Sequence, residues 1–132
     1  MFLTKLKEQE KEAFLMLAHH VAHSDDEFCH KEEQIILGYS LEMSIIGDEY
    51  NKNSFNLQST LKVFESEESK RIVLLELLAL AHCDDVLHDK EQEILTAIKE
   101  VFNFSDGYYS LCSSWAKSIL ALNQQGFQLI TL

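Results

Sequence analysis

Helix-breaking residues are scarce: the 132 residues include no proline and only four glycines. Long apolar runs are also lacking. The longest, from Ile72 to Ala81, is ten residues and contains Glu76. Because a membrane-spanning helix needs about 20 apolar residues, this run predicts a buried core helix. We therefore expect a mostly helical chain without integral membrane association.

Basic residues are half as frequent as acidic ones, with 11 Lys and Arg against 22 Asp and Glu, for a net charge of −11. Surfaces that bind nucleic acid or anionic membranes need an excess of positive charge, so we expect no nucleic-acid partner. The acidic surface suits a cation or a basic partner, or serves solubility alone. An apolar fraction of 46% argues against a disordered chain.

Cysteines number only three, and none forms a CxxC pair. The first residues, MFLTKLKEQEKEAF, carry charges where a signal peptide needs an apolar stretch. We expect free thiols at Cys29, Cys83 and Cys112, in a cytoplasmic protein.

Apolar residues recur at three-four spacing almost throughout, which predicts an all-α fold. We expect one compact domain over residues 1–132, a bundle of about six to seven helices. Polar residues 47–60 predict the main irregular connection, and Gly47 suits the end of the helix before it. The expected helices cover about 4–23, 31–46, 61–64, 66–83, 89–102 and 108–122, and a short apolar tail, 127–132, either packs down or pairs with something.

An internal repeat relates two segments of the chain. Residues 22–36, AHSDDEFCHKEEQII, align without gaps onto residues 81–95, AHCDDVLHDKEQEIL, with seven identical positions at an offset of 59. Each copy falls where one predicted helix ends and the next begins. The repeat therefore predicts two related helix–loop–helix units with a short acidic corner in each.

These two corners, a small residue, aspartates, an apolar residue and then a glutamate, make the chain resemble the TerB-like family of tellurite-resistance proteins. The resemblance implies a compact all-α fold of two repeated helical units. Such domains occur alone, in tellurite-resistance and stress operons, or fused to J-domains. The resemblance also implies metal binding through acidic corner residues. The chain departs from the family where Asp25-Asp26 and Asp84-Asp85 replace the usual Asp-Gly.

The corners allow two interpretations. In the first, they bind a divalent metal cation, with a mixture of imidazole and carboxylate that slightly favours a transition metal over calcium. In the second, the same residues only cap helices, because Glu32 and Glu91 stand three residues after Cys29 and His88, the spacing of a capping box. The candidate metal ligands are His23, Asp25, Asp26, Glu32, His82, Asp84, Asp85 and Glu91.

Catalytic motifs are missing: the sequence has no glycine-rich phosphate loop and no GxSxG, and its adjacent Cys and His residues do not face each other on a helix. We therefore expect no catalytic residues and no enzyme. The expected function is a TerB-like binding module in a stress or tellurite-resistance setting, whose corners hold a cation or a basic partner. The alternative is a structural protein–protein interaction domain that binds a protein partner through an apolar groove or the tail.

Overall fold

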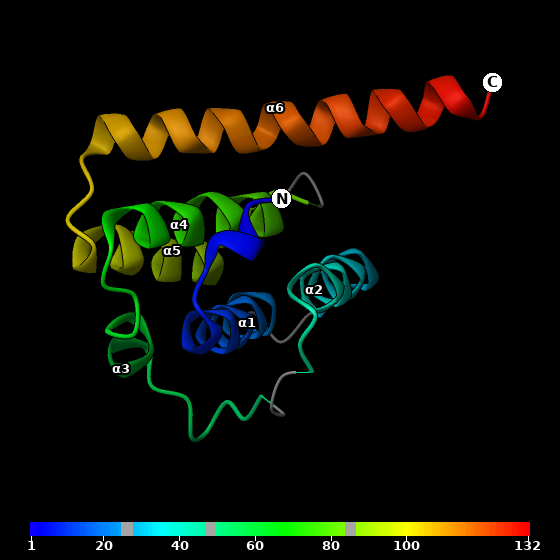
Figure 1. Cartoon of the computed structure of the whole chain (residues 1–132). Coiled ribbons are helices and arrows are strands. Elements are labelled where there is room, and N and C mark those ends of the chain that lie inside the picture. Colours follow the sequence, from blue (N-terminus) through cyan, green and yellow to red (C-terminus); the bar gives the residue numbers. More distant parts are fainter. Residues whose placement is uncertain (25–27, 47–49, 84–86) are drawn as a thin grey trace.

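The computed structural model describes residues 1–24, 28–46, 50–83 and 87–132, and all regular structure in these ranges is helical. This confirms the predicted all-α bundle (Figure 1). Within the described ranges there are six α-helices and one short 3₁₀ turn. They are η1 (Leu3–Lys5), α1 (Glu8–Ala22), α2 (His30–Met43), α3 (Leu57–Leu61), α4 (Glu67–Ala81), α5 (Asp89–Val101) and α6 (Asp106–Ile130).

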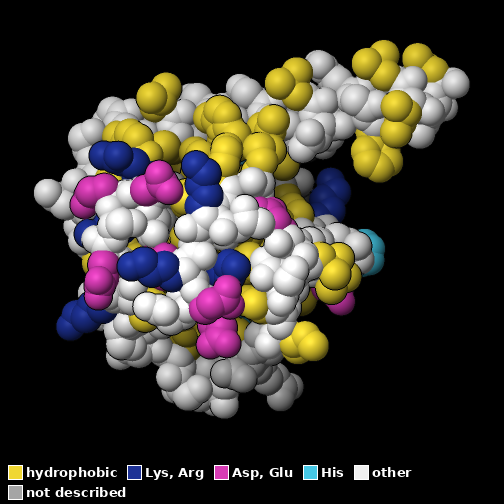
Figure 2. Space-filling model, in the orientation of Figure 1, with side chains coloured by type: hydrophobic (Ala, Val, Ile, Leu, Met, Phe, Trp, Pro, Cys, Tyr) yellow, Lys and Arg dark blue, Asp and Glu magenta, His cyan; other side chains and the backbone are white. Residues whose placement is uncertain are grey.

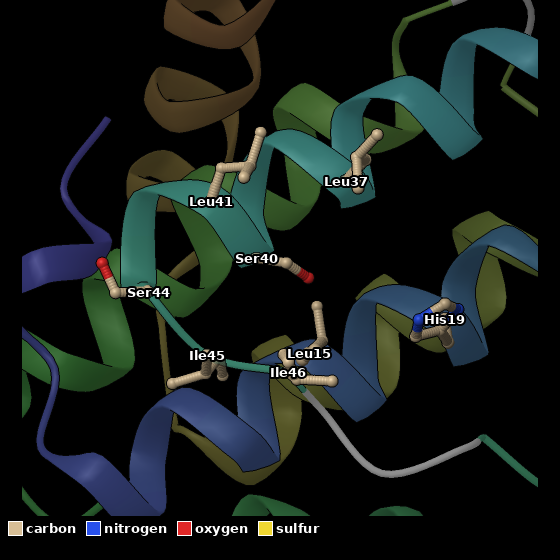
Figure 3. A pocket seen from close by; sticks show the side chains of 8 residues that line it. All are labelled: Leu15, His19, Leu37, Ser40, Leu41, Ser44, Ile45 and Ile46. Atoms are coloured by element: carbon tan, nitrogen blue, oxygen red, sulfur yellow. The ribbon is translucent and has the colours of Figure 1, made fainter.

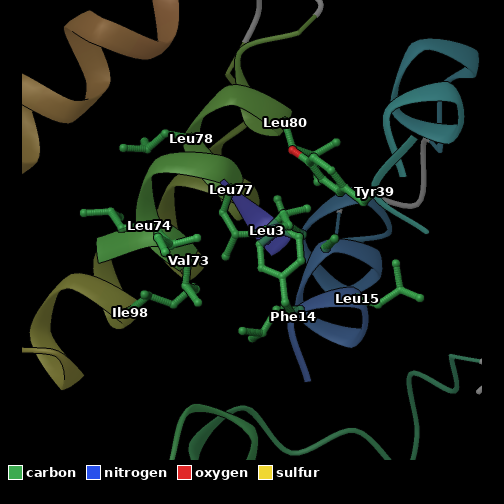
Figure 4. Packing of buried hydrophobic residues seen from close by; sticks show 14 of the residues in the cluster. Leu3, Phe14, Leu15, Tyr39, Val73, Leu74, Leu77, Leu78, Leu80 and Ile98 are labelled. Atoms are coloured by element: carbon green, nitrogen blue, oxygen red, sulfur yellow. The ribbon is translucent and has the colours of Figure 1, made fainter. Parts of the chain in front are cut away.

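Helix α4 is the centre of the bundle, as its apolar sequence predicts. It packs against α1, α5 and α6, and its residues Val73, Leu74 and Leu77 are fully buried. Figure 4 shows Leu77 directed toward Leu3 and Phe14 and Val73 directed toward Ile98, whereas Leu74 points to the other side of α4. The core therefore forms between α1 and α4, and a second apolar contact joins α4 to α6.

Several helix ends differ from the predicted ones. Helix α2 ends at Met43 because Ser44 adopts a left-handed conformation with φ of 55°, and the predicted cap, Gly47, lies outside the described residues. Helix α6 continues to Ile130. The predicted separate tail is thus the end of one long helix, and Figure 1 shows that this end projects beyond the other helices.

The repeat extends over whole helices. Moving α1 by 59 positions gives the bounds of α4, and the same shift takes the start of α2 to the start of α5. Even the left-handed Ser44 after α2 has its counterpart in Asn103 after α5, with φ of 58°. Glu10 and Ser69 occupy equivalent positions, and the Ser69 hydroxyl donates a hydrogen bond to the Glu10 carboxylate at 3.0 Å. The chain is therefore a duplicated helical hairpin to which α3 and α6 are added.

Candidate functional site

The glutamates of both predicted corners act as helix caps. The Glu32 carboxylate accepts the backbone N–H of Cys29 at 3.2 Å, and the Cys29 sulfur accepts the N–H of Glu32 at 3.4 Å. Glu91 accepts the N–H of His88 at 3.4 Å. The predicted capping boxes are therefore present at the start of α2 and α5.

The four corner aspartates, Asp25, Asp26, Asp84 and Asp85, lie outside the described residues. In the part of the chain that the structure describes, no three His, Cys, Asp or Glu side chains are grouped as a metal site requires. The proposed ligand set of eight residues stays a prediction, with Glu32 and Glu91 already engaged by backbone N–H groups.

The corner histidines, His23 and His82, occupy equivalent positions at the ends of α1 and α4 but have different neighbours. The His23 ring stacks on Phe28 with 4.2 Å between centroids. The Nε2 of His82 lies 3.2 Å from the hydroxyl of Ser113 on α6. The duplication therefore placed the same residue type in two environments, one aromatic and one on the α4–α6 contact.

A cluster of aromatic and imidazole rings lies beside the first corner, and we call it the histidine–tyrosine cluster. Tyr50 is its centre: its hydroxyl lies 2.8 Å from Nδ1 of His20. Its ring is also roughly parallel to those of His19 and His23, at 5.9 and 5.5 Å. Phe55 stacks on His20 at 4.2 Å. These contacts attach the polar connection before α3 to α1.

Burial lowers the pKa of all three cluster histidines below the usual 6.5. The charge of Lys52 lowers the pKa of His20 and His23 further, and the neighbouring His23 does so for His19. Burial, followed by the charge of Lys117, likewise lowers the pKa of His82. These imidazoles therefore favour the neutral form, which packs well against aromatic rings.

A groove of about 540 Å³ lies between α1 and α2. Leu15 and Ser40 face each other across it, and Ile45 and Ile46 lie at one end (Figure 3). Three of its apolar side chains are more than half exposed: Leu37 by 54%, Leu41 by 73% and Ile46 by 99%. The lining residues are Leu15, His19, Leu37, Ser40, Leu41, Ser44, Ile45 and Ile46.

In the second repeat, helix α6 packs on α4, the counterpart of α1. Lys99, the counterpart of Ser40, forms an ion pair with Asp106 of α6. Gln92 of α5 donates a hydrogen bond to the Tyr109 hydroxyl of α6 at 3.1 Å. Leu74, the counterpart of Leu15, is fully buried on α4, which packs against α6. Among the described residues, the second hairpin thus has a helix packed on α4, whereas the first has an open groove between α1 and α2.

Neither Tyr50 nor the location of an apolar groove was predicted from the sequence. Tyr50 stands alone in a polar stretch, and no local pattern assigns it a partner on α1. The groove has a signal in the repeat itself: Leu37, Leu41 and Ile46 of the first copy align with Thr96, Glu100 and Ser105 of the second. Apolar residues at exposed positions of one copy alone indicate a surface that only this copy uses.

Comparison with family models, curated proteins and solved structures finds no match to this chain. The TerB-like resemblance therefore stays a prediction that rests on the two corners. Among the described helices, none has the length and apolar content that crossing a membrane requires.

Proposed function

We propose that this chain is a non-catalytic binding module that holds an amphipathic helix of a partner protein in the groove between α1 and α2. One observation carries the proposal: the second hairpin has its own helix, α6, which packs on α4 and contacts α5 through Lys99 and Gln92. A duplicated scaffold that packs a helix on one copy is suited to pack one on the other. Helix-in-groove binding is a common mode of peptide recognition.

Charge defines the partner further. Residues 1–68, which include this groove, carry 14 acidic and 6 basic side chains. A partner helix with leucine-like residues on one face and lysine or arginine on the other matches the apolar groove and the acidic surface around it. The resemblance to TerB-like proteins extends the proposal to a cytoplasmic stress or tellurite-resistance setting.

The test uses a fluorescein-labelled amphipathic peptide with leucines on one face and lysines on the other, titrated with the full chain and followed by fluorescence anisotropy. Replacing Leu37 and Leu41 by serine is expected to weaken binding by tenfold or more, because each leucine that the peptide buries contributes about 1.5–3 kcal/mol. Both side chains are already largely exposed, so the fold tolerates the change.

The matched control is Val101→Ser, which alters an exposed apolar residue of α5 outside the groove. We expect the control to bind the peptide as the unaltered chain does. Absence of binding to the unaltered chain, or equal loss in the control, contradicts the groove as the site. A peptide with glutamate in place of lysine is expected to bind more weakly, because the chain is acidic.

A second candidate function is cation binding at the first corner. It is favoured by the position of His23, which ends α1 immediately before Ser24 and the two aspartates, because imidazole and carboxylate together suit a transition metal. Metal analysis of the untagged protein after incubation with Zn²⁺ or Mn²⁺ tests it. Stoichiometric metal that is lost in Asp25→Asn with Asp84→Asn supports the candidate, and absence of metal contradicts it.

A further inference from the structure

The last part of α6 projects away from the other described helices. Residues 121–132 are all exposed, and Figures 1 and 2 show this part extending past the rest of the bundle with hydrophobic side chains on its surface. A helix segment of this length that stands alone in water is marginally stable, because helices gain most of their stability from packing. The projecting half of α6 therefore requires a surface to cover it.

A heptad pattern runs along one side of α6. Positions at alternating steps of four and three, the spacing of a coiled-coil seam, are apolar at five of seven places. This seam lies beside the arc of Cys112 and Ala116, which is buried against the body of the protein. Within the seam, Trp115 also packs on the body, with its ring centroid 6.0 Å from that of Phe2. The seam positions are Leu111, Trp115, Ser118, Leu122, Gln125, Leu129 and Leu132.

Three leucines of the seam are well exposed: Leu111 by 68%, Leu122 by 60% and Leu129 by 70%. The seam thus continues from the projecting half back onto the half that lies on the body. Heptad spacing specifies another helix as the occupant, since a seam of this period matches the side-chain rows of a second supercoiled helix.

The distribution of charge indicates which helix packs against the seam. The chain has a net charge of −11, yet residues 118–132 contain no Asp, Glu, Lys or Arg. The electrostatic repulsion between two copies of such an acidic protein is weakest when they meet along an uncharged surface. The absence of basic residues also disfavours a membrane surface, since interfacial helices usually carry lysine or arginine on the polar face.

We propose that α6 pairs along this seam with α6 of a second copy, in antiparallel orientation, to form a twofold-symmetric dimer. The same surface then serves both copies. In the antiparallel arrangement, the projecting half of each α6 packs against the first half of the other α6, which lies on the body of its own protomer. The two acidic bodies then lie at opposite ends of the helix pair. Ser118 and Gln125 are the polar seam positions, and they fix the register.

Analytical ultracentrifugation of the full chain over a range of concentrations tests the pairing. The unaltered chain is expected to reach twice the monomer mass of 15.2 kDa. Leu122→Glu with Leu129→Glu is expected to raise the dimer dissociation constant at least 100-fold, because it places four carboxylates in one apolar seam. Its circular dichroism and unfolding midpoint should stay close to those of the unaltered monomer, since both positions are exposed.

Leu41→Glu is the matched control, since it alters an exposed leucine of the α1–α2 groove. It is expected to leave the dimer intact. If the dimer dissociates in Leu41→Glu but not in the seam variant, the pairing through α6 is overturned and the dimer contact lies in the groove. The pairing is also overturned if the unaltered chain is monomeric at all concentrations, whether or not it sediments with neutral phosphatidylcholine vesicles.

X-ray scattering tests the orientation. The antiparallel dimer places the two bodies at opposite ends of a helix pair and predicts an elongated particle with two maxima in its distance distribution. A compact particle with a single maximum overturns the antiparallel arrangement. Because the seam and the groove share no residue, failure of this proposal is distinguishable from failure of the proposed function.

Discussion

His20 lies where the polar connection returns to α1, and it combines a 2.8 Å contact to the Tyr50 hydroxyl with stacking on Phe55. The neutral imidazole can stack on Phe55 with its flat face while its Nδ1 contacts the Tyr50 hydroxyl. Its lowered pKa follows from burial. The histidines near the first corner thus have a structural role whether or not a cation binds beside them.

The pH dependence of stability follows from these lowered pKa values. Unfolded histidines take up protons near pH 6.5, whereas His19, His20, His23 and His82 in the folded chain do so only at lower pH. As the pH falls through 6.5, the unfolded state therefore binds protons first and the free energy of unfolding decreases. Urea denaturation between about pH 7.5 and 5 should show this decrease.

In the same experiment, His20→Phe should make the decrease shallower, because the variant keeps a ring against Phe55 but loses one titrating group. A slope equal to that of the unaltered chain would show that His20 takes up its proton equally readily in the folded and unfolded states.

Glu10 is a second residue whose burial has a measurable consequence. Its carboxylate accepts the backbone N–H of Lys7 at 2.8 Å and the hydroxyl of Ser69 at 3.0 Å. Glu10→Ala leaves two donors without this acceptor and should lower the free energy of unfolding by about 2 kcal/mol. Glu10→Gln keeps an acceptor oxygen and should cost less.

The control for Glu10 is Glu12→Ala, on an exposed position of the same helix, which should change stability by less than about 0.5 kcal/mol. Chemical denaturation of the three variants measures the order. Equal losses in Glu10→Ala and Glu12→Ala would contradict a linking role for Glu10 between α1 and α4.

At the scale of elements, the ends of α2 and α5 offer a matched pair. Ser44 and Asn103 both adopt left-handed backbone conformations, with φ of 55° and 58°. Glycine adopts this conformation without steric cost, and asparagine tolerates it better than serine. Ser44→Gly should therefore stabilise the chain by about 1 kcal/mol and Asn103→Gly by only a few tenths. Urea denaturation measures both, and a destabilising Ser44→Gly would contradict the assignment.

Most helices could be predicted because their signals are local. Apolar spacing places α1, α4 and α5 within a few residues, and Ser66 caps α4 as its side chain predicts, accepting the N–H of Ser69 at 3.1 Å. The end of α6 could not be predicted in this way. The polar stretch around Gln124 and Gly126 suggests a break, yet without proline each residue there can remain helical.

The candidate site was only partly predictable from the sequence. The capping role of Glu32 and Glu91 follows from a three-residue spacing, which is local. The groove depends on how α2 packs across α1, and the position of Tyr50 depends on the return of a long connection. Both are tertiary contacts between segments that are distant in sequence, and the spacing of apolar residues along the chain does not predict such contacts.

In the whole molecule, the second of the two repeated hairpins has an additional helix, α6, packed against it. Helix α6 packs on α4 and contacts α5 through Lys99 and Gln92, whereas the groove between α1 and α2 stays open. The same α6 then extends past the body with an apolar seam. One open groove and one unpaired helix surface make the molecule suited to binding other proteins.

We propose above that the groove between α1 and α2 binds a helix. Methyl NMR spectra of the full chain, labelled at leucine and isoleucine and titrated with the leucine–lysine peptide, test it most directly. We predict shifts at Leu15, Leu37, Leu41, Ile45 and Ile46, which line the groove. Shifts confined to the leucines of α6, with the groove methyls unchanged, would contradict the account.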